Sequence, residues 1–350
     1  MASAVLTPQE AYRSKKIKMA TSGLKIAILM PVTAILQNIF NSSVTDSVSA
    51  SLQDMVIVSI ICSITLLALG DFFGSIFTFI YNLANGKGLE EYKRTANLKI
   101  SWFMLLSAAF AGPMATGCWM AATPFCGLTM VAVITSLGPV MTVFVSSFFL
   151  KEKLNMRIDI GVIIVVCGAI VSGWEGVVGG GSNYILGICL ALLAPIGFTL
   201  EGQFSTYAGD MIDPNVGCGM YRCLGSAVIG MFSMFVLSFM TGNLDAYVSI
   251  IAIALGTPSL LIMTIVMGLL GAINYNAAYL AFNRTGPSRV LAVDSSRPIW
   301  SIPLGFLFAF LGVEPYMVTQ MNIIGAFIVV AGLIFTIGNP KDLVNLRDVS

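Results

Sequence analysis

Histidine is absent from this chain of 350 residues, and only 10% of the residues are charged. Without imidazole groups, the chain cannot build a histidine metal centre or use histidine for acid–base catalysis. The seven cysteines show no CxxC spacing, and no GxxxxGK(S/T) phosphate-binding loop occurs. The sequence therefore predicts no metal, no cofactor, no ATP hydrolysis by the chain itself and no nucleic-acid partner.

Hydrophobic residues make up 57% of the chain, and the mean hydropathy is +0.90. Soluble domains carry about one quarter of charged residues, so this composition indicates a protein embedded in the lipid bilayer. In lipid each backbone group must be bonded within its own segment, which favours an all-α integral membrane fold. The longest polar interval, roughly residues 83–99, is too short to form a soluble domain.

Apolar segments recur along the whole chain, and a membrane-crossing helix needs about 20 such residues. We predict ten transmembrane helices, at residues 21–41, 56–82, 100–121, 127–150, 158–174, 184–206, 218–240, 260–282, 288–311 and 317–337. The apolar piece 246–256 is too short to span the bilayer alone, so it is either an interfacial segment or a lead-in to the eighth helix.

The distribution of Lys and Arg predicts the orientation. Residues 1–20 lack the pattern of a secretory signal and are interpreted as a cytoplasmic basic tail. Basic residues also fall in the segments near 87–99, 151–157, 284–289 and 339–350, whereas the opposite loops have none. By the positive-inside rule both termini are cytoplasmic, with 339–350 a second cytoplasmic tail. We expect the plasma (inner) membrane.

Two halves of the chain carry similar motifs. GVIIVVCG at 161–168 matches GAFIVVAG at 325–332, and SLGPV at 136–140 matches SSRPI at 295–299. Each half would hold an odd number of helices, so the second half must be inverted in the membrane, and the basic residues change loops accordingly. We therefore predict a first five-helix repeat at 21–174, a Gly-rich linker at 175–183 and an inverted repeat at 184–338.

The segments 134–173 and 267–336 resemble EamA-type members of the drug/metabolite transporter superfamily. Each segment has a mid-helix proline, an acidic residue at the helix end and a Gly-flanked helix after it; here these are Pro139 with Glu152, and Pro298 with Glu314. The resemblance implies an inverted-repeat carrier whose central cavity is lined largely by helices 3, 4, 8 and 9. Arg297 departs from the family pattern, which usually has an uncharged or acidic residue there.

Five ionisable residues fall inside the predicted helices, namely Asp71, Glu201, Arg222, Asp294 and Arg297. A charge near the bilayer centre costs about 2.5 to 3.5 kcal/mol on insertion scales, so such residues usually face a cavity or a partner. Three of these residues are acidic and two are basic, so one carboxylate would have no basic partner. Asp71 and Glu201 are therefore candidates for proton coupling or substrate contact, with a structural hydrogen bond as the alternative.

Arg222 lies a few residues into the seventh predicted helix, near Asp210 and Asp213. This position favours a side chain that snorkels to the interface or serves as a gate. Asp294 and Arg297 are three residues apart, hence neighbours on one helix face near the midplane. Either Arg297 binds an anionic group of the substrate while Asp294 orients it, or the two form an internal ion pair that only holds helices together.

Neutral polar residues complete the predicted substrate site. Gln37 lies in the first helix, and Asn274 and Asn276 lie in the eighth. The two asparagines point to different faces, so at most one faces the cavity and the other bonds a neighbouring helix. Trp300, one turn beyond Arg297, is the aromatic candidate for stacking on the substrate.

Trp119 and Tyr279 lie near the ends of the third and eighth predicted helices, which favours an interfacial aromatic belt.

These features predict a secondary transporter, not an enzyme, that moves a small organic metabolite across the membrane by alternating access. An amino acid, a purine or a drug-like solute would suit it, and a surplus carboxylate allows coupling to protons. The alternative is an exchanger of phosphorylated or nucleotide-linked solutes. A channel or receptor and a membrane-embedded enzyme fit the inverted repeat less well. The sequence leaves open whether the chain forms a homodimer.

Overall fold

The structure, a computed structural model, describes residues 8–49, 52, 56–139, 141–142, 145, 156–179, 182–311 and 320–337. Over these residues the chain is helical and contains no strand. The elements are α1 (Pro8–Ala27), α2 (Leu29–Ser49), α3 (Val56–Ala84), α4 (Leu89–Asn97), α5 (Ser101–Ala109), η1 (Phe110–Gly117), α6 (Cys118–Thr135), α8 (Met156–Gly179), α9 (Ser182–Ala208), α10 (Pro214–Gly217), η2 (Cys218–Gly225), α11 (Ser226–Met240), α12 (Leu244–Gly256), α13 (Pro258–Thr285), α14 (Pro287–Asp294), α15 (Arg297–Phe310) and α16 (Gln320–Ile337).

Six helical stretches among the described residues are long and apolar enough to cross a membrane. They run over Ser14–Ser49, Val56–Ala84, Ser101–Leu128, Asn183–Ala208, Pro214–Met240 and Pro258–Thr285. They agree with the predicted helices at these places to within a few residues, except at the first and at the third, which ends at Leu128 instead of residue 121. Residues 127–139, 141–142 and 145 of the predicted fourth helix are described, whereas 146–155, 180–181, 312–319 and 338–350, with Glu152 and Glu314, lie outside the described residues.

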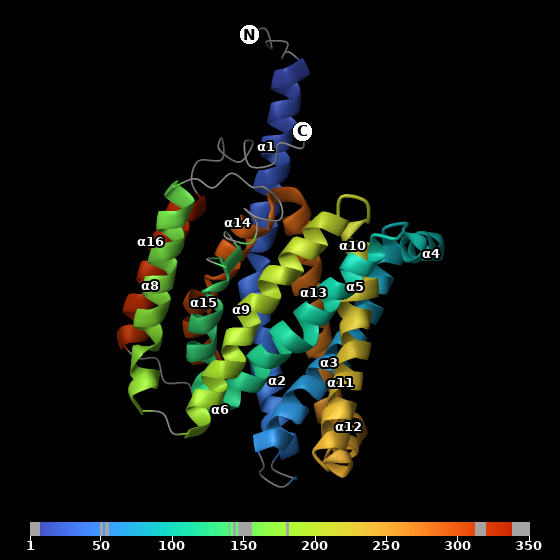
Figure 1. The fold of residues 1–350 in the computed structure, drawn as a ribbon, viewed down its shortest axis with the longest axis vertical. Helices are drawn as coiled ribbons and strands as arrows, with labels where there is room; N and C mark the ends of the chain where they lie inside the picture. Colours follow the sequence, from blue (N-terminus) through green and yellow to red (C-terminus); the bar gives the residue numbers. More distant parts are fainter. Residues whose placement is uncertain are drawn as a thin grey trace.

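The first helix is much longer than predicted. Helix α2 continues to Ser49, whereas the apolar pattern ends near residue 41, and α1 begins at Pro8 inside the predicted tail. This end of α2 packs against neighbouring helices, which bury Val44, Thr45 and Val48, whereas Asp46 and Ser47 are exposed. Figure 1 shows the first turns of α1 extending beyond the rest of the bundle.

The predicted ninth helix, 288–311, is broken in two. Helix α14 ends at Asp294, and α15 begins at Arg297. Pro298 explains the break, because proline has no N–H to donate to the carbonyl of Asp294 and disfavours the helical conformation at the residue before it. The sequence predicted one helix over 288–311 with Asp294 and Arg297 as neighbours; the helix is broken between them, but the two side chains still pair.

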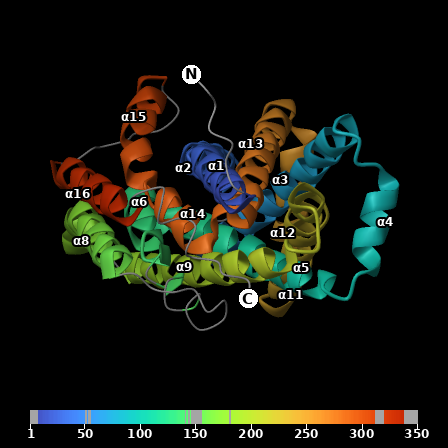
Figure 2. The same ribbon diagram turned by 90° about the horizontal axis from the view of Figure 1, so that it is seen from above.

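The helices α8 and α16 pack together at one edge of the bundle, and α4 lies at the opposite edge (Figure 2). Both contain the repeated motif, and both use glycines for close approach. A Cβ atom at Gly168 would lie 2.9 Å from the carbonyl oxygen of Gly325, and one at Gly332 would lie 2.9 Å from that of Gly161. Residue numbers rise along one helix as they fall along the other, so the two equivalent segments pack antiparallel.

The short apolar segment is a separate helix, α12, between α11 and α13. It has 13 residues, fewer than a span requires, and it packs against α3.

The predicted orientation can be tested on two exposed positions. Asp46 lies near the end of α2, and Glu90 lies on the short polar helix α4. With both termini cytoplasmic, Asp46→Cys should react with a membrane-impermeant thiol reagent added to intact cells, and Glu90→Cys should react only after the cells are permeabilised. The reverse pattern would show that the orientation is wrong.

Candidate functional site

Two groups of buried charges lie inside the bundle. The Arg222 cluster contains Asp71 from α3, Glu201 from α9 and Arg222 from η2. The Arg297 pair contains Asp294 from the end of α14 and Arg297 from the start of α15. All five charged side chains are at most 7% exposed. In such an environment charges persist only when they are paired and hydrogen-bonded.

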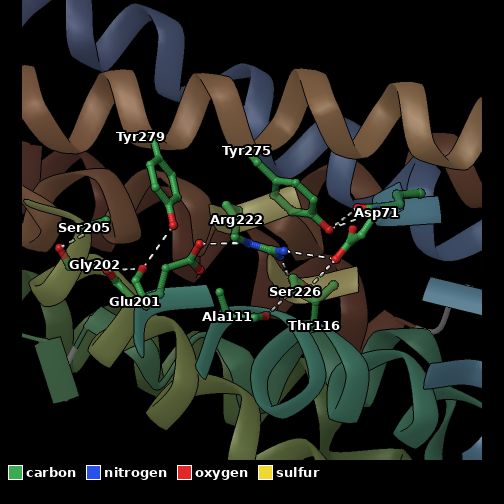
Figure 3. Close-up of polar contacts among 12 residues, drawn as sticks. Asp71, Ala111, Thr116, Glu201, Gly202, Ser205, Arg222, Ser226, Tyr275 and Tyr279 are labelled. Carbon is green, nitrogen blue, oxygen red and sulfur yellow. Dashed lines mark hydrogen bonds and ion pairs between the residues drawn. The ribbon is translucent and has the colours of Figure 1, made fainter. Parts of the chain in front are cut away.

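Arg222 uses each nitrogen of its guanidinium group for a different element (Figure 3). The Nε atom donates to Glu201 Oε1 at 3.0 Å, Nη1 donates to Asp71 Oδ2 at 3.2 Å, and Nη2 donates to Thr116 Oγ1 at 2.9 Å. The guanidinium carbon lies 3.6 Å from the centre of the Tyr275 ring. One fully buried arginine thereby connects α3, α9, η1 and α13.

Local helix geometry brings these groups together. Both Thr116 and Arg222 lie in π-helical segments, η1 and η2, which are rare and often occur at functional sites. A Cβ atom at Gly112 in η1 would lie 1.7 Å from Ser226 Oγ, so the backbone there approaches α11 more closely than any other residue type allows. The Ser226 hydroxyl in turn donates to Asp71 Oδ2 at 2.6 Å.

Tyrosines of α13 extend the network on both sides. The hydroxyl of Tyr275 accepts a hydrogen bond from Gln37 Nε2 at 3.0 Å, which ties α13 to α2. The hydroxyl of Tyr279 lies 3.0 Å from Ser107 Oγ, and Ser107 contacts the backbone carbonyl of Glu201. The Arg222 cluster is therefore fixed from every neighbouring helix and has little freedom to rearrange in this conformation.

The Arg297 pair has a different construction. Arg297 donates to both oxygens of Asp294, through Nε at 3.1 Å and through Nη2. Its guanidinium carbon lies 4.8 Å from the Trp119 ring and 4.9 Å from the Phe198 ring, so both rings supply cation–π contacts. Two buried donors have no hydrogen-bond partner among the described residues, namely Arg297 Nη1 and Trp119 Nε1.

The two groups meet at a small central cavity with a volume of about 20 Å³ in this conformation. Its polar lining comes from α2, η1, α9, α13, α14 and α15, and consists of Gln37, Thr116, Glu201, Asn274, Tyr275, Asp294 and Arg297. Trp119 and Phe198 are among its apolar lining residues. A few convergent polar groups in a mostly apolar concavity are typical of small-molecule sites.

Five predicted site residues lie on the cavity wall, namely Gln37, Glu201, Asn274, Asp294 and Arg297. Asp71 and Arg222 are not on this wall, but Arg222 contacts it through Glu201 and Thr116, and Asp71 is linked to it through Arg222. Five ionisable residues from distant parts of the sequence thus come together at one site around the cavity.

Three predictions about individual side chains are wrong. Arg222 does not snorkel: its side chain is 0% exposed, and its partners are Asp71 and Glu201. Asp213 instead pairs with Lys87 at 2.7 Å and caps α10.

The interfacial placement of Trp119 and Tyr279 is also wrong, because both are buried, at 1% and 2% exposure. The α5–α6 stretch and α13 are longer than the predicted helices, which moves both residues inward. Trp300, expected to stack on a substrate, does not line the cavity and donates to Ser296 Oγ at 3.2 Å. Asn276 bonds Thr78 of α3 at 2.9 Å, so of the two asparagines only Asn274 lines the cavity.

Sequence reasoning did not identify Thr116, Phe198 or Ser226 as site residues. None is ionisable, and hydroxyls and rings are common in membrane helices, so the sequence carried little signal. The segment FTLEG around Glu201 offered one hint, because Phe198 lies three residues before the carboxylate and thus on the same helix face.

Comparison with known proteins shows what this chain is similar to. Residues 27–174 match the EamA-like transporter family, as the sequence resemblance predicted. Protein LicB of Haemophilus influenzae is 22% identical over 238 residues, which cover 66% of this chain and 75% of LicB. One protein of known crystal structure aligns with 89% of this chain and 96% of its own, with a TM-score of 0.58 and 17% identity, which shows a shared fold.

The structure predicts that Arg222 is essential for folding. In Arg222→Gln two buried carboxylates lose their common cation, which should cost about 3 to 5 kcal/mol of stability. Thermal unfolding of the detergent-solubilised protein measures the effect. The control is Lys87→Gln, which removes a partly exposed ion pair and should cost about 1 kcal/mol or less. Equal losses in the two variants would contradict the structural role of the cluster.

Proposed function

Because residues 27–174 belong to the EamA-like transporter family, we propose that this chain is a secondary transporter that moves a small organic metabolite by alternating access. The observation that carries the proposal is the central cavity, where an arginine with an unpartnered donor, a second carboxylate and aromatic rings converge inside membrane helices. Carriers bind their substrates near the bilayer midplane between helices, where broken helices supply polar groups. The break between α14 and α15 is such a place.

The proposal includes ten transmembrane helices arranged as two inverted repeats. The packing of α8 against α16 supports it, because equivalent residues make the same contact in each direction. Gly168 contacts Gly325, and its counterpart Gly332 contacts Gly161, as a two-fold axis between antiparallel helices requires. The two halves would move against each other around the cavity.

The unpartnered donors of the cavity wall suggest which substrate group binds there. Arg297 Nη1 and Trp119 Nε1 can only donate, so they suit a carboxylate, a carbonyl or another acceptor group. The rings of Trp119 and Phe198 would accommodate an apolar or planar body. An amino acid, a purine or a similar metabolite has both features.

An exchanger of phosphorylated solutes has less support. That function would use both Arg222 and Arg297 as phosphate ligands, but all three nitrogens of Arg222 are already engaged by Glu201, Asp71 and Thr116. Only Arg297 lines the cavity. A single available guanidinium nitrogen suits one acceptor group better than a dianionic phosphate.

Proton coupling is the second part of the proposal. The Arg222 cluster holds two carboxylates against one guanidinium group, whereas Asp294 and Arg297 balance each other. An uncompensated buried carboxylate is costly, and a bound proton removes the charge. Glu201 lines the cavity and Asp71 does not, so protonation of the cluster can respond to the substrate through Glu201.

Counterflow into proteoliposomes, with a panel of amino acids, purines and sugar phosphates, tests the function. Trp119→Phe keeps the ring beside Arg297 and removes one donor, so apparent substrate affinity should fall about 10-fold. Arg297→Lys loses the planar guanidinium group and should weaken binding at least as much. The double variant Arg297→Gln with Asp294→Asn should fold but not transport. Full transport by the double variant would show that this ion pair is only structural.

Proton coupling predicts a separation of two activities. Because Asp71→Asn and Glu201→Gln remove a titratable group while leaving the cavity shape, accumulation driven by a pH gradient should be lost in at least one of them. Counterflow at equal pH on both sides should remain. Unchanged gradient-driven accumulation in both variants would rule out coupling through this cluster.

A further inference from the structure

Helix α2 carries a polar residue at every fourth position along most of its length. The row consists of Thr33, Gln37, Asn41, Thr45 and Ser49. Residues four apart are neighbours on a helix surface, and each step of four turns about 40° further around the axis, so these five form one polar row that winds along α2. The first four are at most 7% exposed, although the helix lies in a stretch apolar enough to cross a membrane.

The row begins at the central cavity and runs away from it. Gln37 lines the cavity and bonds Tyr275. Asn38, beside it, donates to Thr123 Oγ1 of α6 at 3.1 Å. Further along, Asn41 and Thr45 follow toward the end of α2 that carries the exposed residue Asp46. Gln37, Asn38, Asn41 and Thr45 of α2, together with Thr123 of α6, thus form a buried polar seam on the side of the cavity opposite the basic loops.

The seam is poorly hydrogen-bonded. The amide nitrogen of Asn41 contacts the carbonyl of Ser63 at 3.5 Å and the thioether sulfur of Met120 at 2.8 Å, and a thioether is a weak acceptor. Thr45 reaches Asn41 Oδ1 only at 3.5 Å. A buried amide with such partners is unfavourable, so these contacts do not explain why amides occur here.

Burial alone does not explain them either. Between and beside the row, α2 also holds buried aliphatic residues at the same depths: Ile35, Ile39, Val44 and Val48 are at most 2% exposed. Aliphatic side chains would fill the seam with no unsatisfied polar atoms. Neither hydrogen bonding nor burial in this conformation therefore explains the polar row.

We propose that the polar row of α2 is one wall of the path from the central cavity to the outer surface, exposed to water when the carrier opens outward. This inference rests on the transporter proposed above. From Gln37 to Ser49 the helix rises about 18 Å, close to half of a bilayer whose hydrocarbon core is about 30 Å thick. Asn38, Asn41, Thr45 and Thr123 are then residues over which the hydrated solute passes, and in the closed state they bond weakly to one another.

Cysteine accessibility in intact cells tests the path. Thr45 and Val44 are adjacent and equally buried, at 2% and 1% exposure, but only Thr45 belongs to the row. Thr45→Cys and Asn41→Cys should react with an impermeant methanethiosulfonate reagent added outside, at least 10-fold faster than Val44→Cys and Ile39→Cys. The unsubstituted chain gives the background from the native cysteines. Thr45→Cys is close to isosteric, so it retains the fold if Asn41→Cys does not.

Three results would overturn the inference: no reaction at either row position, equal reaction at the row and the aliphatic controls, or reaction only from the cytoplasmic side. These results are independent of transport, because the reagent itself is the probe. If counterflow is measured but the row does not react, the carrier stands and the path is wrong. If the row reacts but no solute of the panel exchanges, the carrier proposal fails and a water-filled cleft remains.

Discussion

The structure depends on the cost of placing charge inside a membrane. Arg222 meets that cost by serving as the common partner of Asp71 and Glu201, with Thr116 and the Tyr275 ring completing its surroundings. Removing Arg222 would leave two carboxylates without a cation in a low-dielectric interior. Helices from both predicted halves of the chain are thus held at one point, which lies beside the cavity.

Regular helices could not build this site. The π-helical segments η1 and η2 carry Thr116 and Arg222, and the chain between α14 and α15 is interrupted between Asp294 and Arg297. Irregular backbone is tolerated at membrane depth only where it is buried in protein or lines a cavity. The departures from ideal helix therefore coincide with the buried charged groups, and two of them have a local cause, Pro113 in η1 and Pro298 at the start of α15.

The two charged groups differ in how much binding capacity they retain. The guanidinium group of Arg222 is fully engaged, whereas Arg297 keeps one buried nitrogen without a partner on the cavity wall. This difference is why we propose a role in helix packing and proton coupling for the first group, and contact with the solute for the second. The polar row of α2 is a similar case, because its side chains are polar at buried positions where aliphatic side chains would leave no polar atom unsatisfied.

The sequence by itself determined the membrane class, the places of the long apolar helices and the five ionisable residues of the site, because hydropathy and rare intramembrane charges are local properties. It also indicated the family through Pro139, Pro298 and the repeated glycine motif. It did not determine which charges pair. Arg222 is close in sequence to Asp210 and Asp213, yet it binds Asp71, 151 residues away, and Glu201.

Only the tertiary structure decided this pairing, the burial of Trp119 and the helix break after Asp294. Pairing depends on how helices rotate and cross, which hydropathy does not encode, because every face of a membrane helix can be apolar. The sequence thus identifies the ionisable residues that need partners inside the bundle, and the packing of the helices determines which residues those partners are.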